Sequence, residues 1–270
     1  MQTMASTASG KRKAVIPPTE QSDEALKAQL RAEGWHFPKD NQTSAPVQPT
    51  AVAASAEEAG EILIGMACQN GSQAIDGILS AMISDPRPEV QAQGCNAISV
   101  LSEKEAGRNH VLGKGAVQAV VAAMQMHPSA PAVQGRGCAA LGNLTVGDGE
   151  TAVLQGYGVE AVLAAMANHP SDGFVQTKAC LALGNMGYGS AGEVAVVDKG
   201  GVQAIVAALQ AHGSDEKLVE EACDALQNLA ANVQAKQTLI DMGLVAMLEA
   251  ARAAYPASAG VAELLDTLKA

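Results

Sequence analysis

The sequence repeats itself with a period of 42 or 43 residues. Four cysteines, Cys95, Cys138, Cys180 and Cys223, lie 43, 42 and 43 residues apart. Three other residue types keep nearly the same steps: Asn143, Asn185 and Asn228; His127, His169 and His212; Gly115, Gly158, Gly201 and Gly243. Because a period of about 40 to 47 residues is typical of proteins in which each helical unit packs only on its neighbours, we expect a helical solenoid.

The unit that begins at Glu105 shows which helices one period contains. Apolar residues with helical spacing predict helices at residues 106–112, 116–126 and 132–144. Gly113 and Gly115 end the first helix, while Pro128 and Pro131 separate the second from the third. Aromatic residues are 2% of a chain that is 48% hydrophobic, so small aliphatic side chains are predicted to form the core. These features predict an all-α protein.

Two runs of this unit, NHVLGKGAVQAVVAAM from Asn109 and VQGRGCAALGNL from Val133, resemble the armadillo repeat family, whose members include β-catenin and importin alpha. The resemblance implies a right-handed armadillo-type α-solenoid of about five three-helix repeats. The units are expected at residues 56–101, 102–145, 146–187, 188–231 and 232–270. Residues 1–54 are rich in Pro, Ser, Thr and Gln, and are predicted to form a flexible arm with one short helix near residues 22–33.

The formal net charge of −11 arises entirely in residues 55–270. A body of this charge repels phosphate groups, so we expect no nucleic acid partner. No apolar run approaches the length of about 18 residues that spans a bilayer, so we expect no membrane insertion. The N-terminus lacks the apolar segment of a secretory signal, which favours a cytoplasmic protein and also allows a nuclear or axonemal one. Import into an organelle is the alternative, because the first residues are basic and rich in Ser and Thr.

Residues that could carry chemistry all have a simpler explanation. The GxGxxG pattern from Gly187 to Gly192 follows an expected helix rather than a strand, so it is predicted to be a turn between helices. The periodic cysteines would lie about 10 Å apart, too far to bridge or to share a metal, and are predicted to be buried thiols. The periodic histidines are expected to bond the last carbonyl groups of each second helix. We therefore expect no enzyme, no cofactor, no metal and no catalytic residue.

The third helix of each unit carries a polar stripe. If its apolar residues point inward, the asparagine and the residues four and seven positions before it lie on the opposite side. The resemblance implies that this stripe lines a concave groove, where the asparagines bond the main chain of an extended peptide. Asparagines that cap the following turn are the alternative. The stripe consists of Gln93, Asn96 and Val100; Arg136, Ala139 and Asn143; Lys178, Leu181 and Asn185; Glu221, Asp224 and Asn228.

The charge of the stripe changes sign along the predicted solenoid. Arg136 and Lys178 are basic, whereas Glu221 and Asp224 are acidic, so a ligand with one acidic and one basic segment would match it. Scattered solvated charge is the alternative explanation. Importin alpha carries Trp four residues before its asparagines, where this chain has Ala, Leu and Asp, so binding of nuclear localisation signals in that manner is not expected.

We therefore expect a non-catalytic adaptor or scaffold that binds a protein segment in its groove. A structural subunit of a large axonemal or organellar assembly, with the arm ordered against its neighbours, is the alternative. Trp35 and Phe37 are candidate anchors in the arm, because a buried aromatic side chain contributes strongly to docking. They could dock on a partner or on the solenoid itself, and a mobile arm without a role is also possible.

Overall fold

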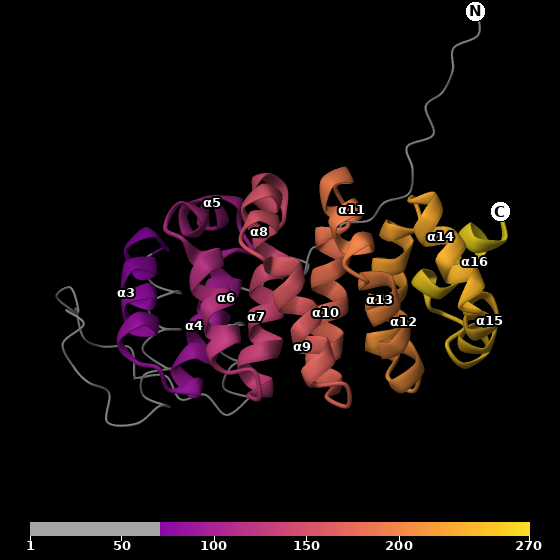
Figure 1. Cartoon of the computed structure of the whole chain (residues 1–270), viewed down its shortest axis with the longest axis horizontal. Helices are drawn as coiled ribbons and strands as arrows, with labels where there is room; N and C mark the ends of the chain where they lie inside the picture. The colour runs from indigo at the N-terminus through magenta and orange to yellow at the C-terminus, as the bar shows by residue number, and fades with distance from the viewer. Residues whose placement is uncertain (1–70) are drawn as a thin grey trace, which may run out of the picture.

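The computed structural model describes residues 71–270 (Figure 1). Within this range the chain forms α-helices and one 3-10 helix and no strand, which confirms the predicted all-α class. The elements are α3 (Gly71–Ser84), α4 (Pro88–Leu101), α5 (Glu105–Gly113), α6 (Ala116–Met126), α7 (Pro131–Leu144), η1 (Gly147–Gly149), α8 (Glu150–Gln155), α9 (Gly158–Asn168), α10 (Gly173–Met186), α11 (Ser190–Asp198), α12 (Gly201–Ala211), α13 (Glu216–Leu229), α14 (Val233–Asp241), α15 (Leu244–Ala254) and α16 (Ala259–Lys269).

The helices recur in threes along the chain. A short first helix, a second helix and a long third helix follow one another as α5, α6 and α7, then α8, α9 and α10, then α11, α12 and α13, then α14, α15 and α16. The helix predicted at 116–126 has these bounds in the structure. The helix predicted at 132–144 begins one residue earlier, and the one predicted at 106–112 begins one residue earlier and ends one residue later. The arm at residues 1–54 with its helix near 22–33, Trp35, Phe37 and the start of the first unit lie outside the described residues.

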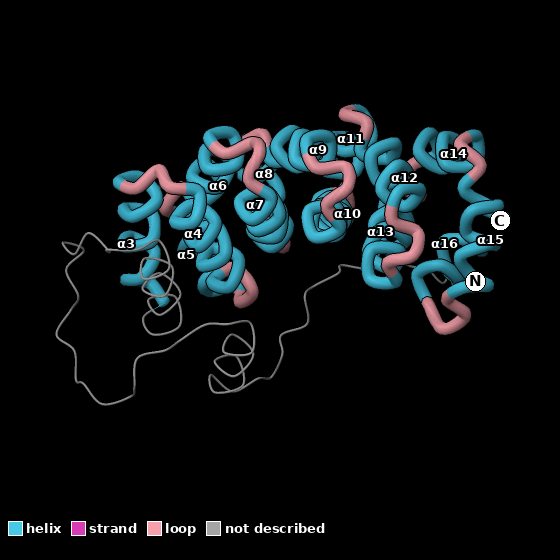
Figure 2. Tube along the Cα trace, turned by 90° about the horizontal axis from the view of Figure 1, so that it is seen from below, coloured by secondary structure: helices cyan, strands magenta, loops and turns pink. Residues whose placement is uncertain are grey.

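Two layers of helices form the body of the molecule (Figure 2). The third helices α4, α7, α10, α13 and α16 each contact the next one, and we call them the third-helix layer. The second helices α3, α6, α9 and α12 also contact in series, and together with α15 we call them the second-helix layer. Leu141, Leu183, Ile205 and Leu226 are among the large side chains that are completely buried. The first helices stand at one end of these layers (Figure 1).

Local sequence fixes where each third helix starts. Pro88 and Pro131 stand in the first turn of α4 and α7, where a missing N–H costs nothing. Asp172 and Asp215 precede α10 and α13, and their carboxylates accept hydrogen bonds from the backbone N–H groups three residues later, at 3.0 and 3.2 Å. The starts of the third helices are therefore encoded in two different ways in the two halves of the stack.

Glycines inside the third helices bring neighbouring helices close together. A Cβ atom added at Gly142 in α7 would lie 3.0 Å from the Cα atom of Ala182 in α10. One added at Gly184 in α10 would lie 3.0 Å from the Cα atom of Ala225 in α13. The backbones of the third-helix layer therefore approach as closely as only glycine and alanine permit.

The histidines do not have the role predicted for them. The Nε2 atoms of His169 and His212 donate to the carbonyl oxygens of Pro128 and Pro170, both at 2.8 Å, in the turn of the preceding unit. The prediction that they bond the last carbonyl groups of their own second helix is therefore wrong. Glutamines of the third helices do that instead: the Nε2 atom of Gln134 donates to Met124 and His127 at 2.8 and 2.9 Å, and that of Gln176 to Met166 and His169 at 2.9 Å.

The glycine series also needs one correction. The residues that precede α6, α9, α12 and α15 have a positive φ, and these residues are Gly115, Tyr157, Gly200 and Gly243, with φ of 81, 63, 84 and 75°. Gly158 and Gly201, which the sequence pattern placed in the series, are instead the first residues of α9 and α12. A tyrosine thus occupies a backbone conformation that glycine adopts in the three neighbouring units.

The cysteines and the glycine-rich turn lie where the sequence predicts. Cys95, Cys138, Cys180 and Cys223 are free and buried, and burial raises the pKa of every one of these thiols, to about 12 for Cys95 and Cys223. The segment from Gly187 to Gly192 joins α10 to α11. It therefore connects two helices, as expected, and has no preceding strand.

Candidate protein-binding surface

The third-helix layer places the predicted charged residues in one series. Arg136 lies on α7, Lys178 on α10, and Glu221 and Asp224 on α13, and all four are half-buried. Because α7, α10 and α13 contact one another in this order, basic side chains occupy the first two helices and acidic ones the third. The polarity predicted from the sequence is thus arranged across three adjacent helices.

The pKa of Glu221 reflects this setting. Burial raises it and is the largest effect, so it remains raised although Lys178 and Lys217 outweigh Asp224 and Glu220 in the opposite direction. A cation from a partner would stabilise the ionised carboxylate in this half-buried position.

The predicted asparagines are buried between the third helices. Asn143, Asn185 and Asn228 are 5, 3 and 1% exposed. Each amide nitrogen donates a hydrogen bond to the preceding unit: Asn143 to the carbonyl oxygen and hydroxyl of Ser99 at 3.1 Å, Asn185 to the carbonyl oxygen of Gly142 at 3.2 Å, and Asn228 to that of Gly184 at 3.1 Å. In this structure the asparagines therefore connect successive third helices.

This arrangement restricts what the asparagines can offer to a peptide. The donors that reach the neighbouring helix are already engaged, whereas the Oδ1 atom of Asn185 is buried and has no hydrogen-bond partner among the described residues. Because this oxygen is buried, a peptide N–H group cannot reach it in the arrangement of helices seen here. Main-chain recognition by the asparagines stays a prediction.

The other residues of the stripe differ from one unit to the next. Gln93 and Leu181 are 9 and 6% exposed, whereas Asn96, Val100 and Ala139 are half-buried. In α13 the amide of Gln227 donates to the hydroxyl of Thr267 in α16 at 2.9 Å, across the last contact of the layer. The charged residues of the stripe therefore lie on α7, α10 and α13, and those on α4 are uncharged.

The sequence pattern did not reveal which groups the asparagines bond. Their acceptors in α7 and α10 are the carbonyl groups of Gly142 and Gly184, and a glycine directly precedes two of the asparagines, at Gly142-Asn143 and Gly184-Asn185. The Gly-Asn dipeptide is the sequence signal for these bonds. Its glycine allows the two third helices to approach closely, and its asparagine donates a hydrogen bond to the preceding third helix.

Residues 74–270 hold no group of three or more His, Cys, Asp or Glu side chains placed to bind a metal ion. In the same part of the chain no single helix is long and apolar enough to cross a membrane, and α11 and α12 reach that length and hydropathy only as a pair bent by 69°.

Known proteins agree with this architecture. Residues 190–231 match the Armadillo/beta-catenin-like repeat. Two crystal structures of engineered proteins from the Northeast Structural Genomics Consortium have the same fold. The first has a TM-score of 0.65 and 23% identity, and covers 81% of this chain and 93% of its own. The second has a TM-score of 0.66 and 24% identity, and covers 79% of this chain and 91% of its own.

No curated protein sequence gave a match. The match at residues 190–231 covers α11, α12 and α13, which are one complete set of first, second and third helices. The chain is therefore a helical repeat solenoid that carries an armadillo repeat, as its resemblance to that family predicted.

Proposed function

We propose that the chain is a non-catalytic adaptor or scaffold that binds an extended segment of another protein along its third-helix layer. The observation that carries the proposal is the charge series of Arg136, Lys178, Glu221 and Asp224 across three adjacent helices. A ligand with an acidic segment against α7 and α10 and a basic segment against α13 satisfies both signs.

The armadillo fold supports this proposal in general terms, because stacked helical units form long continuous surfaces that suit extended ligands. The raised pKa of Glu221 supports the basic segment in particular, since a cation placed there relieves its surroundings. We place this activity in the cytoplasm.

A charge exchange within the surface tests the proposal. The double variant Lys178→Glu, Glu221→Lys keeps the net charge and removes the separation of basic from acidic side chains, because Arg136 and Asp224 keep their charges. The control Asp76→Lys, Lys114→Asp exchanges the partners of an exposed ion pair of 2.9 Å between α3 and the residue after α5. Neither residue belongs to the candidate binding surface. Proteins retained by the wild-type chain in affinity purification with mass spectrometry should be retained by the control and lost from the first variant.

Retention of the same proteins by both variants would contradict the proposal. The alternative, a structural subunit of an axonemal or organellar assembly whose arm is ordered against neighbours, makes a different prediction for the same experiment. In that case, removal of residues 1–54 would abolish retention and the charge exchange would not.

A further inference from the structure

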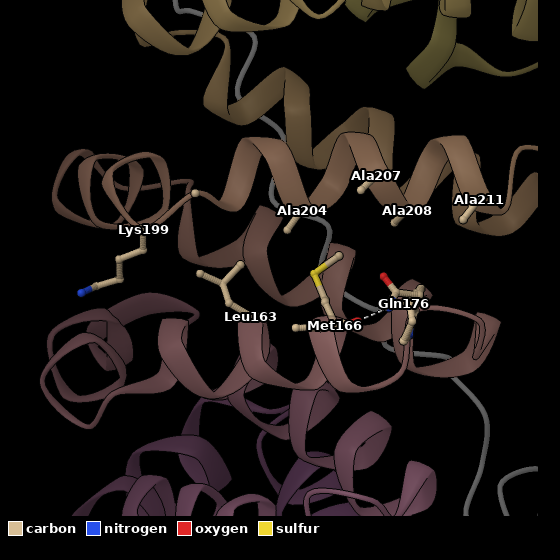
Figure 3. A pocket seen from close by; sticks show the side chains of 11 residues that line it. Leu163, Met166, Gln176, Lys199, Ala204, Ala207, Ala208 and Ala211 are labelled. Carbon is tan, nitrogen blue, oxygen red and sulfur yellow. Dashed lines mark hydrogen bonds between the residues drawn. The ribbon is translucent and has the colours of Figure 1, made fainter.

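The second-helix layer contains a pocket between α9 and α12 (Figure 3). Its volume is about 390 Å³. Leu163 and Met166 face it from α9, alanines from α12 form the opposite wall, and Lys199 stands at one end (Figure 3). The pocket is therefore apolar along its length and charged at one end, and it lies in the layer opposite the third helices.

A comparison with the next junction explains why the pocket exists. Between α12 and α15 the amide of Gln210 approaches the sulfur of Met247 at 3.9 Å. The residues at these two positions of the α9–α12 junction are Ala167 and Ala204, both of which line the pocket. Two long side chains are thus replaced by two methyl groups, and the space they would fill is left open.

The charged end of the pocket is already paired, because Lys199 forms an ion pair with the Oε1 atom of Glu160 at 2.8 Å. The rest of the lining is mostly alanine, leucine and methionine. The occupant should therefore be an apolar group of aromatic size.

We propose that the segment around Trp35 and Phe37 of the same chain occupies this pocket. Trp35 is the one tryptophan of the chain, and it stands two residues before one of the two phenylalanines. A flat aromatic ring fits a slot lined by alanine methyl groups, and Met166 adds a sulfur that packs well on such rings.

The length of the intervening chain allows this docking. Even when the first unit begins at residue 56, as the sequence predicts, residues 38–55 can span up to about 60 Å when extended. The pocket lies two to three units along the stack, and units follow one another at about one helix diameter, or roughly 10 Å. The segment can therefore reach the pocket from the first unit without disturbing the described helices. This inference does not depend on the proposed function, because it concerns the opposite layer.

Trp35 provides its own test, since tryptophan fluorescence reports on this residue alone. In the full-length wild-type chain we expect a blue-shifted emission maximum and weaker quenching by acrylamide than in the urea-denatured chain. The variant Ala167→Gln, Ala204→Met copies the filled α12–α15 junction. Its emission maximum and quenching should shift to the values of the denatured chain while its helical circular dichroism is retained.

The control is Ala250→Gln, which adds a side chain at an exposed position of α15, and it should leave the fluorescence of Trp35 unchanged. The variant Ala207→Gln provides a second way to obstruct the pocket, because Ala207 lines it and is exposed, so the fold should tolerate the change. Wild-type fluorescence equal to that of the denatured chain would overturn the proposal. So would protection that persists in both filled variants, or protection that is lost on dilution, which would assign the pocket to another copy of the chain.

Discussion

The two layers of this solenoid use the same small residues in opposite ways. In the third-helix layer Gly142 and Gly184 let the helices touch backbone to backbone, and asparagines bond across the contact. In the second-helix layer Ala167 and Ala204 stand apart and leave a pocket of about 390 Å³. Small side chains therefore produce tight packing only where a hydrogen bond and a matching neighbour hold the two helices together.

This difference suggests that the third-helix layer carries most of the stability and that the second-helix layer can accept change. The first layer has buried donors and acceptors that lose their partners if the helices separate. The second has bonds near the surface, such as that from His212 to the carbonyl of Pro170, where water can take the place of the lost group. Five predictions test this contrast, from the largest expected effect to the smallest.

The largest effect concerns the rate at which thiols react. Cys138 and Cys180 are completely buried in the third-helix layer, and burial raises the pKa of both thiols. If they react only on global unfolding, which costs at least about 5 kcal/mol, labelling should be slowed by more than about a thousandfold. A cysteine introduced by Ala122→Cys, at an exposed position of α6 in the second-helix layer, should react at nearly the rate of a free thiol. Fast labelling of the native cysteines, followed by mass spectrometry, would show that the helix faces are assigned wrongly.

The second prediction concerns steric contact. Gly184→Leu inserts a side chain where a Cβ atom already lies 3.0 Å from the Cα and Cβ atoms of Ala225. The helices must move apart, and we expect a loss of about 3 kcal/mol in the free energy of unfolding. Ala122→Leu adds the same side chain at an exposed position of α6 in the second-helix layer and should cost less than about 0.5 kcal/mol. Urea denaturation measures both, and equal losses would refute the contrast between the layers.

The period of the sequence was enough to predict the helices but not their contacts. Several residue types at steps of 42 and 43 fix where units begin, so the helix at 116–126 could be predicted with its bounds. The same steps cannot tell whether a side chain bonds its own unit or the one before. For that reason His169 and His212 were assigned to the wrong carbonyl groups, and Gln134 and Gln176 were missed.

The candidate site shows the same limit. The charges of Arg136, Lys178, Glu221 and Asp224 could be placed on one stripe because helical spacing determines which residues share a face. The pocket could not be predicted, because it depends on what is missing at Ala167 and Ala204 relative to Gln210 and Met247. To predict the pocket, one would have to know that Gln210 of α12 and Met247 of α15 contact each other, and that Ala167 and Ala204 are their equivalents one unit earlier.

The third prediction concerns the asparagine bonds. Asn185→Ala removes the donor to the carbonyl oxygen of Gly142 and leaves that acceptor buried, so the free energy of unfolding should fall by about 2 kcal/mol. His212→Ala removes a bond of 2.8 Å near the surface and should cost about 0.5 kcal/mol. The two variants, compared by thermal and urea unfolding, rank the layers directly. A larger loss for His212→Ala would show that the second-helix layer, and not the third-helix layer, contributes more to stability.

The fourth prediction concerns pH. The folded pKa of Glu221 is raised above its ordinary value of 4.5, so the folded chain binds a proton that the unfolded chain releases in the window between the two values. The contribution of Glu221 to stability is therefore greatest below its ordinary pKa and is lost as the pH rises through the window. Glu221→Gln should be more stable relative to the wild type at pH 7 than at pH 3.5. An unfolding difference that is constant between these pH values would rule out the raised pKa.

The smallest effect concerns the backbone before α9. Tyr157 has φ of 63° and is 65% exposed, so it has the cost of a left-handed conformation and little packing to offset that cost. Tyr157→Gly removes this strain, while glycine adds conformational freedom to the unfolded chain, and we expect a net gain of about 0.5 kcal/mol. The reverse change, Gly200→Tyr, places the same side chain at the equivalent position of the next unit, where φ is 84°, and should lose about 1 kcal/mol. Differential scanning calorimetry resolves both. If Tyr157→Gly is destabilising, the tyrosine ring must contribute a contact that outweighs its strain. The start of α9 would then be better packed than the alanine-lined pocket in the same layer.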